Sequence, residues 1–137
     1  MRTSPKLLLA ALCLILVAGV TSPLDAQDQS ATQFYVAYRA AFAKATKVEE
    51  VMPYMSKGRL AQMEKTPAGE RAKMFEMIKA MGSYTSIKVV KEDKTADGAT
   101  LSVEAIDSDK EKVTGTVQIV KEGTAWKLDR ESWKGSL

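Results

Sequence analysis

The chain contains no histidine, and its only cysteine, Cys13, lies in an apolar run near the N-terminus. Histidine is the most common metal ligand and proton carrier near neutral pH, and cysteine thiolate is the other main zinc ligand. Their absence from the rest of the chain excludes zinc sites, histidine-bound haem, and Ser-His or Cys-His nucleophiles. A glycine-rich phosphate loop is also missing. The sequence therefore predicts no metal site and no cofactor, and leaves carboxylate, Tyr, Lys and Arg side chains to carry any chemistry.

The first 26 residues are typical of a secretory signal peptide. Arg2 and Lys6 precede an apolar run over residues 7–20, which is shorter than the roughly 20 residues that cross a bilayer as a helix. Ala26 offers a cleavage point, which leaves residues 27–137 as the mature domain. Leu24 is bulky for the position three residues before that cut, so retention as a membrane anchor is an alternative. We expect an exported protein, periplasmic or extracellular, with no membrane span after signal removal.

Residues 27–137 have the size of one compact domain. Exported domains often contain disulfides, but none can form within this one because Cys13 lies in the signal. The chain has 20 Lys and Arg against 17 Asp and Glu, with the two signs interspersed. Because no basic stripe is interleaved with aromatic residues, we expect no nucleic-acid partner.

The first part of this domain has helical periodicity. Ser30 and Gln33 fit a capping box, which predicts an amphipathic helix over residues 31–45. Arg39 and Lys44 are left for water. The apolar face of this helix consists of Phe34, Tyr38, Ala41, Phe42 and Ala45.

A second, shorter helix is predicted after Thr46, which together with Glu49 fits another capping box. Pro53 should bend or end this helix. Residues 56–65 then continue helically, with Leu60 and Met63 among their apolar positions. The inward residues of the second helix are predicted to be Val48, Val51, Met52 and Met55.

Thr66 followed by Pro67 predicts the start of a long helix that ends at Gly82. Its apolar face is predicted to consist of Met74, Phe75, Ile78 and Met81, with Met77 at the edge. The charged pairs on these helices, Lys57 with Arg59 and Arg71 with Lys73, are interpreted as solvated faces.

After Gly82 the apolar period changes from about 3.6 residues to 2, which indicates strands. Asp97 and Gly98 predict a two-residue hairpin turn, and strands joined by such short turns run antiparallel. The inward residues of the four predicted strands are Ile87 and Val89; Leu101, Val103 and Ala105; Val113, Gly115, Val117 and Ile119; and Trp126 and Leu128. The sequence thus predicts an α+β domain with N-terminal helices packed on a four-stranded antiparallel sheet.

The aromatic first helix, the segment VEEVMPYMSKGRL, and the final segment GTAWKLDRESW occur in the order seen in one known superfamily. In this respect the chain resembles secreted bacterial members of the nuclear-transport-factor-2-like superfamily, also called the cystatin-like or ketosteroid-isomerase-like cone. The resemblance implies a strongly curved sheet whose concave face and helices enclose a pocket. Enzymatic members place a polar dyad there, often Asp with His or Tyr. This chain has no histidine, and none of its predicted inward strand positions is a carboxylate.

Five residues are predicted to contact a ligand in such a pocket: Tyr38, Tyr54, Met77, Met81 and Trp126. Tyr38 shares a helix face with aromatic residues, and the flexible thioethers of the Met-rich helices suit varied apolar partners. The alternative interpretation is simple core packing, with the Tyr38 hydroxyl at the rim. Trp133 lies beyond the last predicted strand, and is expected either to pack back onto the helices or to cap the open end of the cone; exposure at the surface would indicate an interface instead.

These features favour a non-enzymatic exported domain that binds a small apolar ligand or a protein partner between helices and sheet. One alternative is a small isomerase- or dehydratase-like enzyme that uses a buried tyrosine, such as Tyr38, with a carboxylate. Another is an interaction module that binds an envelope protein. A homodimer is compatible with the sequence.

Overall fold

The computed structural model describes residues 29–81, apart from the side chain of Met81, and residues 84–135. The predicted signal peptide lies outside them. The helical segments are α1 (Ala31–Lys44), η1 (Val48–Glu50), η2 (Met52–Tyr54), α2 (Lys57–Glu64) and α3 (Ala68–Met81). The strands are β1 (Thr85–Lys94), β2 (Gly98–Ile106), β3 (Lys112–Glu122) and β4 (Ala125–Lys134). Within the described ranges, each helix is too short or too polar to cross a membrane.

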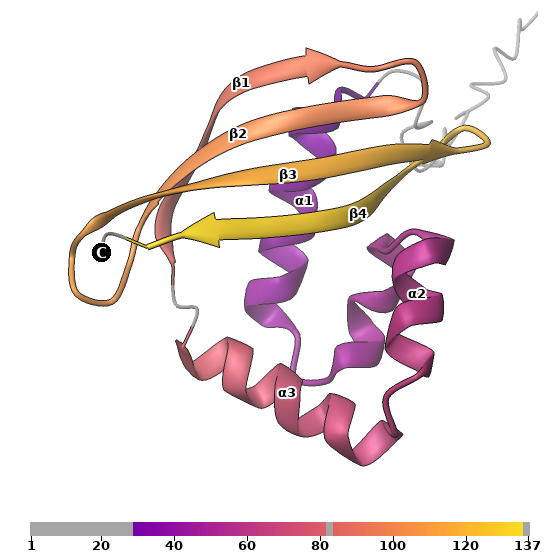
Figure 1. Ribbon diagram of the computed structural model, residues 1–137. Coiled ribbons are helices and arrows are strands. Elements are labelled where there is room, and N and C mark those ends of the chain that lie inside the picture. Colours follow the sequence, from indigo (N-terminus) through magenta and orange to yellow (C-terminus); the bar gives the residue numbers. More distant parts are fainter. Residues whose placement is uncertain (1–28, 82–83, 136–137) are drawn as a thin grey trace, which may run out of the picture.

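The four strands form one antiparallel sheet in the order β1-β2-β3-β4. Figure 1 shows the sheet as a curved, open layer, with α1 across one face and α2 and α3 beyond its lower edge. This arrangement confirms the predicted α+β class, in which the helices precede the sheet.

Helix α1 begins at the predicted capping box. The backbone N–H of Gln33 donates to Ser30 Oγ at 3.1 Å, and the backbone N–H of Ser30 donates to Gln33 Oε1 at 2.9 Å. The two bonds satisfy donors that a helix start otherwise leaves free. Ala45 caps the helix at its other end, so its predicted extent is confirmed.

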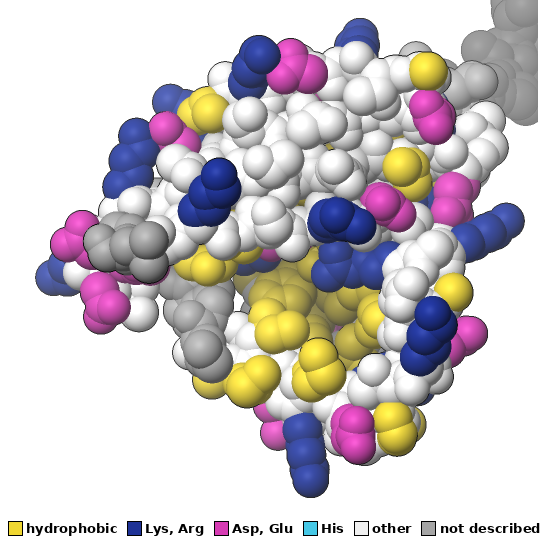
Figure 2. Space-filling model, viewed as in Figure 1, with side chains coloured by type: hydrophobic (Ala, Val, Ile, Leu, Met, Phe, Trp, Pro, Cys, Tyr) yellow, Lys and Arg dark blue, Asp and Glu magenta, His cyan; other side chains and the backbone are white. Residues whose placement is uncertain are grey.

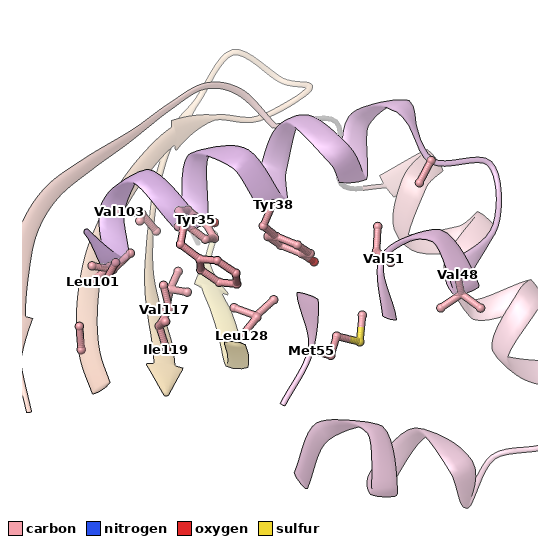
Figure 3. Packing of buried hydrophobic residues seen from close by; sticks show 14 of the residues in the cluster. Tyr35, Tyr38, Val48, Val51, Met55, Leu101, Val103, Val117, Ile119 and Leu128 are labelled. Carbon is pink, nitrogen blue, oxygen red and sulfur yellow. The ribbon is translucent and has the colours of Figure 1, made fainter. Parts of the chain in front are cut away.

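The main core lies between α1 and the sheet. Tyr35, which the predicted apolar face omitted, is fully buried together with Leu101, Ile119 and Leu128. In Figure 3, Tyr35 points toward the strands, whereas Tyr38, almost one turn further along α1, points toward Val51 and Met55. Tyr35 therefore packs in the core between α1 and the sheet, whereas Tyr38 reaches the space beyond that core.

The segment after α1 differs from its prediction in two respects. It forms the two short turns η1 and η2, with Pro53 inside the second, instead of one helix. Thr46 pairs with Glu50 and not with Glu49: its Oγ1 donates to Glu50 Oε1 at 3.0 Å, because a tight turn changes which side chain reaches back. The predicted burial of Val48, Val51 and Met55 is confirmed.

Helix α3 starts after Thr66 and Pro67 as predicted, but most of its apolar face is not core. Phe75 is buried, whereas Met74 and Ile78 are about half exposed, at 49% and 48%. The reason is visible in Figure 1, where α3 lies apart from the sheet. The predicted packing of Met74 and Ile78 into the core is therefore wrong.

The first hairpin also differs from its prediction. Gly98 is the first residue of β2 and pairs with Val120 of β3, so the turn comprises residues 95–97. Thr95 closes this turn by donating its backbone N–H to the carbonyl of Gly98 at 3.0 Å. Gly98 has no positive φ, so a close approach of β3, and not turn geometry, accounts for glycine at this position.

Candidate functional site

A cavity of about 320 Å³ opens beyond the core, between the C-terminal half of α1, η1, α2, α3 and the end of β4. Figure 2 shows it as a hollow below the sheet, with hydrophobic side chains on its walls and Lys or Arg side chains along its upper edge. The apolar residues that line it are Phe42, Val48, Val51, Met55, Met63, Met74, Phe75 and Ile78. The half-exposed side chains of Met74 and Ile78 on α3 thus border this cavity.

A β-bulge in β4 shapes the sheet side of this cavity. Ile119 pairs with Leu128 and the adjacent Gln118 pairs with Arg130, so Asp129 is an extra residue without a partner on β3. An extra residue reverses the alternation of side chains beyond it. Glu131 and Trp133 consequently face the cavity. With strict alternation from Leu128 they would have pointed to the opposite face of the sheet.

Glu131 is held there by buried contacts. Its side chain is only 11% exposed, and Oε1 accepts from Arg39 Nη1 at 3.0 Å and from Trp133 Nε1 at 2.7 Å. The Arg39 side chain is 14% exposed, and its guanidinium carbon lies 5.0 Å from the centre of the Phe42 ring. These contacts fix a buried ion pair at the cavity wall.

Three predictions are therefore wrong. No carboxylate was expected to face inward, yet Glu131 does so because of the bulge at Asp129. Arg39 was expected in water, yet it pairs with Glu131, because β4 extends to Lys134 and passes alongside α1. Trp133 belongs to β4, so its predicted place beyond the last strand is wrong; it is partly buried and packs against the core.

Two phenols lie beside the ion pair. Burial, and then the negative charge of Glu131, raise the pKa of Tyr38 to about 12. The same two causes raise the pKa of Tyr35 well above its usual range. The Tyr35 hydroxyl and Glu131 Oε2 are both buried, and neither has a hydrogen bond of normal geometry among the described residues. Both phenols therefore stay neutral at physiological pH.

We expect alkaline pH to destabilise the domain through these phenols. Below their ordinary pKa of 10.0 both are neutral in the folded and the unfolded chain. At higher pH only the unfolded chain releases the protons, so the free energy of unfolding falls as the pH rises toward the folded pKa of Tyr38, about 12. Tyr38 alone accounts for roughly 2–3 kcal/mol once the pH has passed about 12, and for about half of that at about pH 11, at about 1.4 kcal/mol per pKa unit.

Urea unfolding between about pH 8 and about pH 11 measures this effect. The Tyr38→Phe variant should lose stability less steeply than the wild type above about pH 10 and in parallel with it below. Equal slopes for the two proteins above that pH would contradict the expectation.

Two further arginines line the cavity, and the prediction that they lie on solvated faces is wrong. Arg59 lies one helical turn before Met63 on α2, and Arg71 Nη1 donates to the Met63 carbonyl at 3.3 Å. Arg71 Nε is buried and has no hydrogen-bond partner among the described residues. Both arginines thus border the cavity beside α2.

The bulge residue also positions the helix that carries Arg59. Ser56 is buried, and its Oγ donates to Asp129 Oδ1 at 2.7 Å. Ser56 Oγ also accepts from the backbone N–H of Arg59 at 3.1 Å. The backbone N–H of Ser56 donates to the Leu128 carbonyl at 2.9 Å. One irregularity in β4 therefore turns Glu131 inward and fixes the start of α2.

The five predicted ligand-binding residues are not brought together. Tyr38 lines the main cavity. Tyr54 packs its ring against Tyr38, at 5.9 Å between ring centres, without lining the cavity. Met77 is 53% exposed and lines a smaller neighbouring pocket with Ile78, Tyr84 and Trp133. Met81 ends α3, and its side chain lies outside the described part.

Trp126 lies away from the main cavity. Its Nε1 donates to the Gln29 carbonyl at 2.7 Å, and it borders a separate, more polar pocket near the β1–β2 turn. Trp126 precedes the bulge and Trp133 follows it, so the two tryptophans of β4 serve different sites.

Sequence reasoning missed Arg39, Arg59, Arg71 and Glu131 as cavity residues. One signal was available: Leu128, Glu131 and Trp133 have spacings of three and two, so a bulge would place all three on one face. The arginines gave no comparable signal, because an exposed helix face and a cavity wall look alike in a sequence. Within residues 29–81 and 84–135, no cluster of three acidic residues could hold a metal ion.

The chain has no significant match to a protein-family model, a curated protein or a solved structure. The resemblance to the nuclear-transport-factor-2-like superfamily therefore stays a prediction. Function has to be inferred from the chemistry of the cavity itself.

Proposed function

We propose that this domain binds a small, largely apolar molecule in the cavity between helices and sheet. The observation that carries the proposal is a space of about 320 Å³ whose walls are mostly Phe, Val, Met and Ile side chains. Binding pockets for small molecules have roughly 300–1,000 Å³, mostly apolar walls and a few fixed polar groups. Arg39, Arg59, Arg71 and Glu131 make up the charged part of the lining here.

Apolar walls left open to water favour an occupant. Met74 and Ile78 are each about half exposed where they border the cavity. Covering such surface stabilises a complex by about 25 cal/mol per Å² before the costs of association. The unbranched thioethers of Met55, Met63 and Met74 can adjust to the shape of the occupant.

An enzyme that uses Tyr38 and a carboxylate is the alternative, and Glu131 supplies a carboxylate near that phenol. This carboxylate, however, is largely buried and paired with Arg39. Oε1 already accepts two hydrogen bonds, and Oε2 has almost no exposed surface. A general base must reach the proton that it removes, so we prefer binding over catalysis.

Two expectations from the sequence belong to the same proposal. Export would place the domain in the periplasm or outside the cell, where small apolar molecules have to be carried or sensed. A cone of the nuclear-transport-factor-2-like kind would use this same space between its helices and concave sheet face as the binding pocket.

Binding can be measured with N-phenyl-1-naphthylamine, a neutral apolar dye that fluoresces when it leaves water. We expect saturable binding to the purified chain. Met63→Trp should lower the affinity at least about tenfold, because the larger side chain fills the cavity. Gln62→Trp, an exposed neighbour on the same helix, is the matched control and should bind as the wild type does.

Urea unfolding of each variant checks that the fold is retained. Absence of saturable dye binding by the wild type would overturn the proposal. Equal binding by Met63→Trp and Gln62→Trp would place the dye elsewhere on the protein and would overturn it as well.

A further inference from the structure

We propose that the molecule bound in this cavity is an anionic amphiphile, an apolar body with one acidic head group, and that Arg59 and Arg71 hold the head group. This inference rests on the proposed function and adds the chemical class of the ligand. The juxtaposition behind it is an apolar cavity bordered beside α2 by two arginines, Arg59 and Arg71.

The charges around the cavity do not balance. The charged residues that line the cavity are Arg39, Arg59, Arg71 and Glu131. Arg39 and Glu131 neutralise each other through their ion pair at 3.0 Å. Across the described ranges, neither Arg59 nor Arg71 forms an ion pair with a carboxylate. The cavity therefore has an excess of two positive charges.

Hydrogen-bonding capacity is also unused on that wall. The side chain of Arg59 has no hydrogen-bond partner in the described part of the chain, and Arg71 makes a single long bond to the Met63 carbonyl. The remaining N–H groups of these two guanidinium forks can therefore donate to an arriving acceptor.

An acidic group, carboxylate or phosphate, fits these donors better than a neutral or a cationic group does. Guanidinium presents its N–H donors in a planar fork that matches a carboxylate or phosphate, and bonds between charged partners are about twice as strong as neutral ones. A neutral ligand would leave both guanidinium groups unpaired, and a cationic one would be repelled. A small inorganic anion would leave the apolar walls uncovered.

The size of the cavity suggests the length of the probe. About 320 Å³ holds on the order of ten water-sized groups at roughly 30 Å³ each. Decanoate, 1-decanol and decyltrimethylammonium share one apolar chain of that size and differ in charge. Each can be titrated against the bound N-phenyl-1-naphthylamine at low salt.

We expect decanoate to displace the dye at a concentration at least about tenfold lower than 1-decanol does, with decyltrimethylammonium the weakest. The substitution Arg59→Gln breaks no side-chain hydrogen bond in the described structure. It should remove most of the difference in displacing concentration between decanoate and 1-decanol. Arg71→Gln should act in the same direction. Arg130→Gln, an exposed arginine of β4 outside the cavity, should leave the difference unchanged.

The outcomes separate the two proposals. If the dye binds but 1-decanol displaces it as well as decanoate does, the anionic head group is wrong and the binding function stands. If Arg59→Gln and Arg71→Gln both keep the preference for decanoate, the assigned head-group site is wrong. If the dye does not bind, the proposed function is overturned, and the head-group assignment that rests on it is overturned as well.

Discussion

Replacement of Glu131 by alanine is expected to lower the free energy of unfolding by about 3–5 kcal/mol, which is typical when one partner of a buried ion pair is removed. The carboxylate is only 11% exposed and accepts bonds from both Arg39 and Trp133. Without it, the Arg39 guanidinium stays buried with no counter-charge, and the Trp133 N–H loses its acceptor. Urea unfolding at neutral pH measures the loss.

A double-mutant cycle distinguishes the ion pair from general damage to β4. The double variant Glu131→Leu with Arg39→Met removes both charges and keeps apolar volume. It should lose clearly less stability than the sum of the losses for Glu131→Leu and Arg39→Met measured singly. Asp93→Ala is the control, because its ion pair with Lys91 is more than half exposed on both sides and is worth at most about 1 kcal/mol. Similar losses for Glu131→Ala and Asp93→Ala would mean that Glu131 is not held as described.

Replacement of Gly98 by alanine is expected to cost about 3 kcal/mol, at the upper end of what overpacking usually costs. A Cβ at this position would overlap the carbonyl oxygen of Ile119 and lie 2.9 Å from the Cα of Val120. Both neighbours are backbone atoms of β3, which pairs with strands on both sides and cannot move away alone. Relief of the clash would therefore open the β2–β3 ladder next to the first hairpin.

Gly69→Ala provides the matched comparison for Gly98→Ala. A Cβ at Gly69 would have no heavy atom within 4 Å, and the residue lies in helix α3. The same substitution should there leave stability unchanged or raise it by up to about 1 kcal/mol, because alanine favours a helix. If thermal unfolding shifted in the same direction for both variants, close approach of β3 would not explain the glycine at position 98.

The cavity and the core depend on different kinds of information. Ser30 with Gln33, and the alternation around Leu101 and Val117, are local patterns, and the sequence placed the corresponding helix and strands correctly. Hydrogen-bond capping and periodic burial act over a few residues, so a linear pattern suffices to identify them. Of the four predicted ligand-binding residues whose side chains are described, Tyr38 alone lines the main cavity.

The residues that the sequence left in solvent are those that define the site. Arg39 became buried because the end of β4 passes beside it, and the reason lies some 90 residues away at the bulge of Asp129. Arg59 and Arg71, predicted to lie on solvated faces, line the cavity because α3 does not pack against the sheet. Such distances between partners have no signature in the spacing of neighbouring side chains.

The sequence alone determined the order of helices and strands, the α+β class, the absence of histidine and thiol chemistry, and most of the buried positions between α1 and the sheet. Tertiary structure alone decided that Glu131 faces inward, that Arg39 pairs with it, and that two unpaired arginines border an open apolar space. The physical reason is that secondary structure follows local hydrogen bonding and periodicity, whereas a cavity and its charges depend on the register of one bulged strand and on which distant elements come into contact.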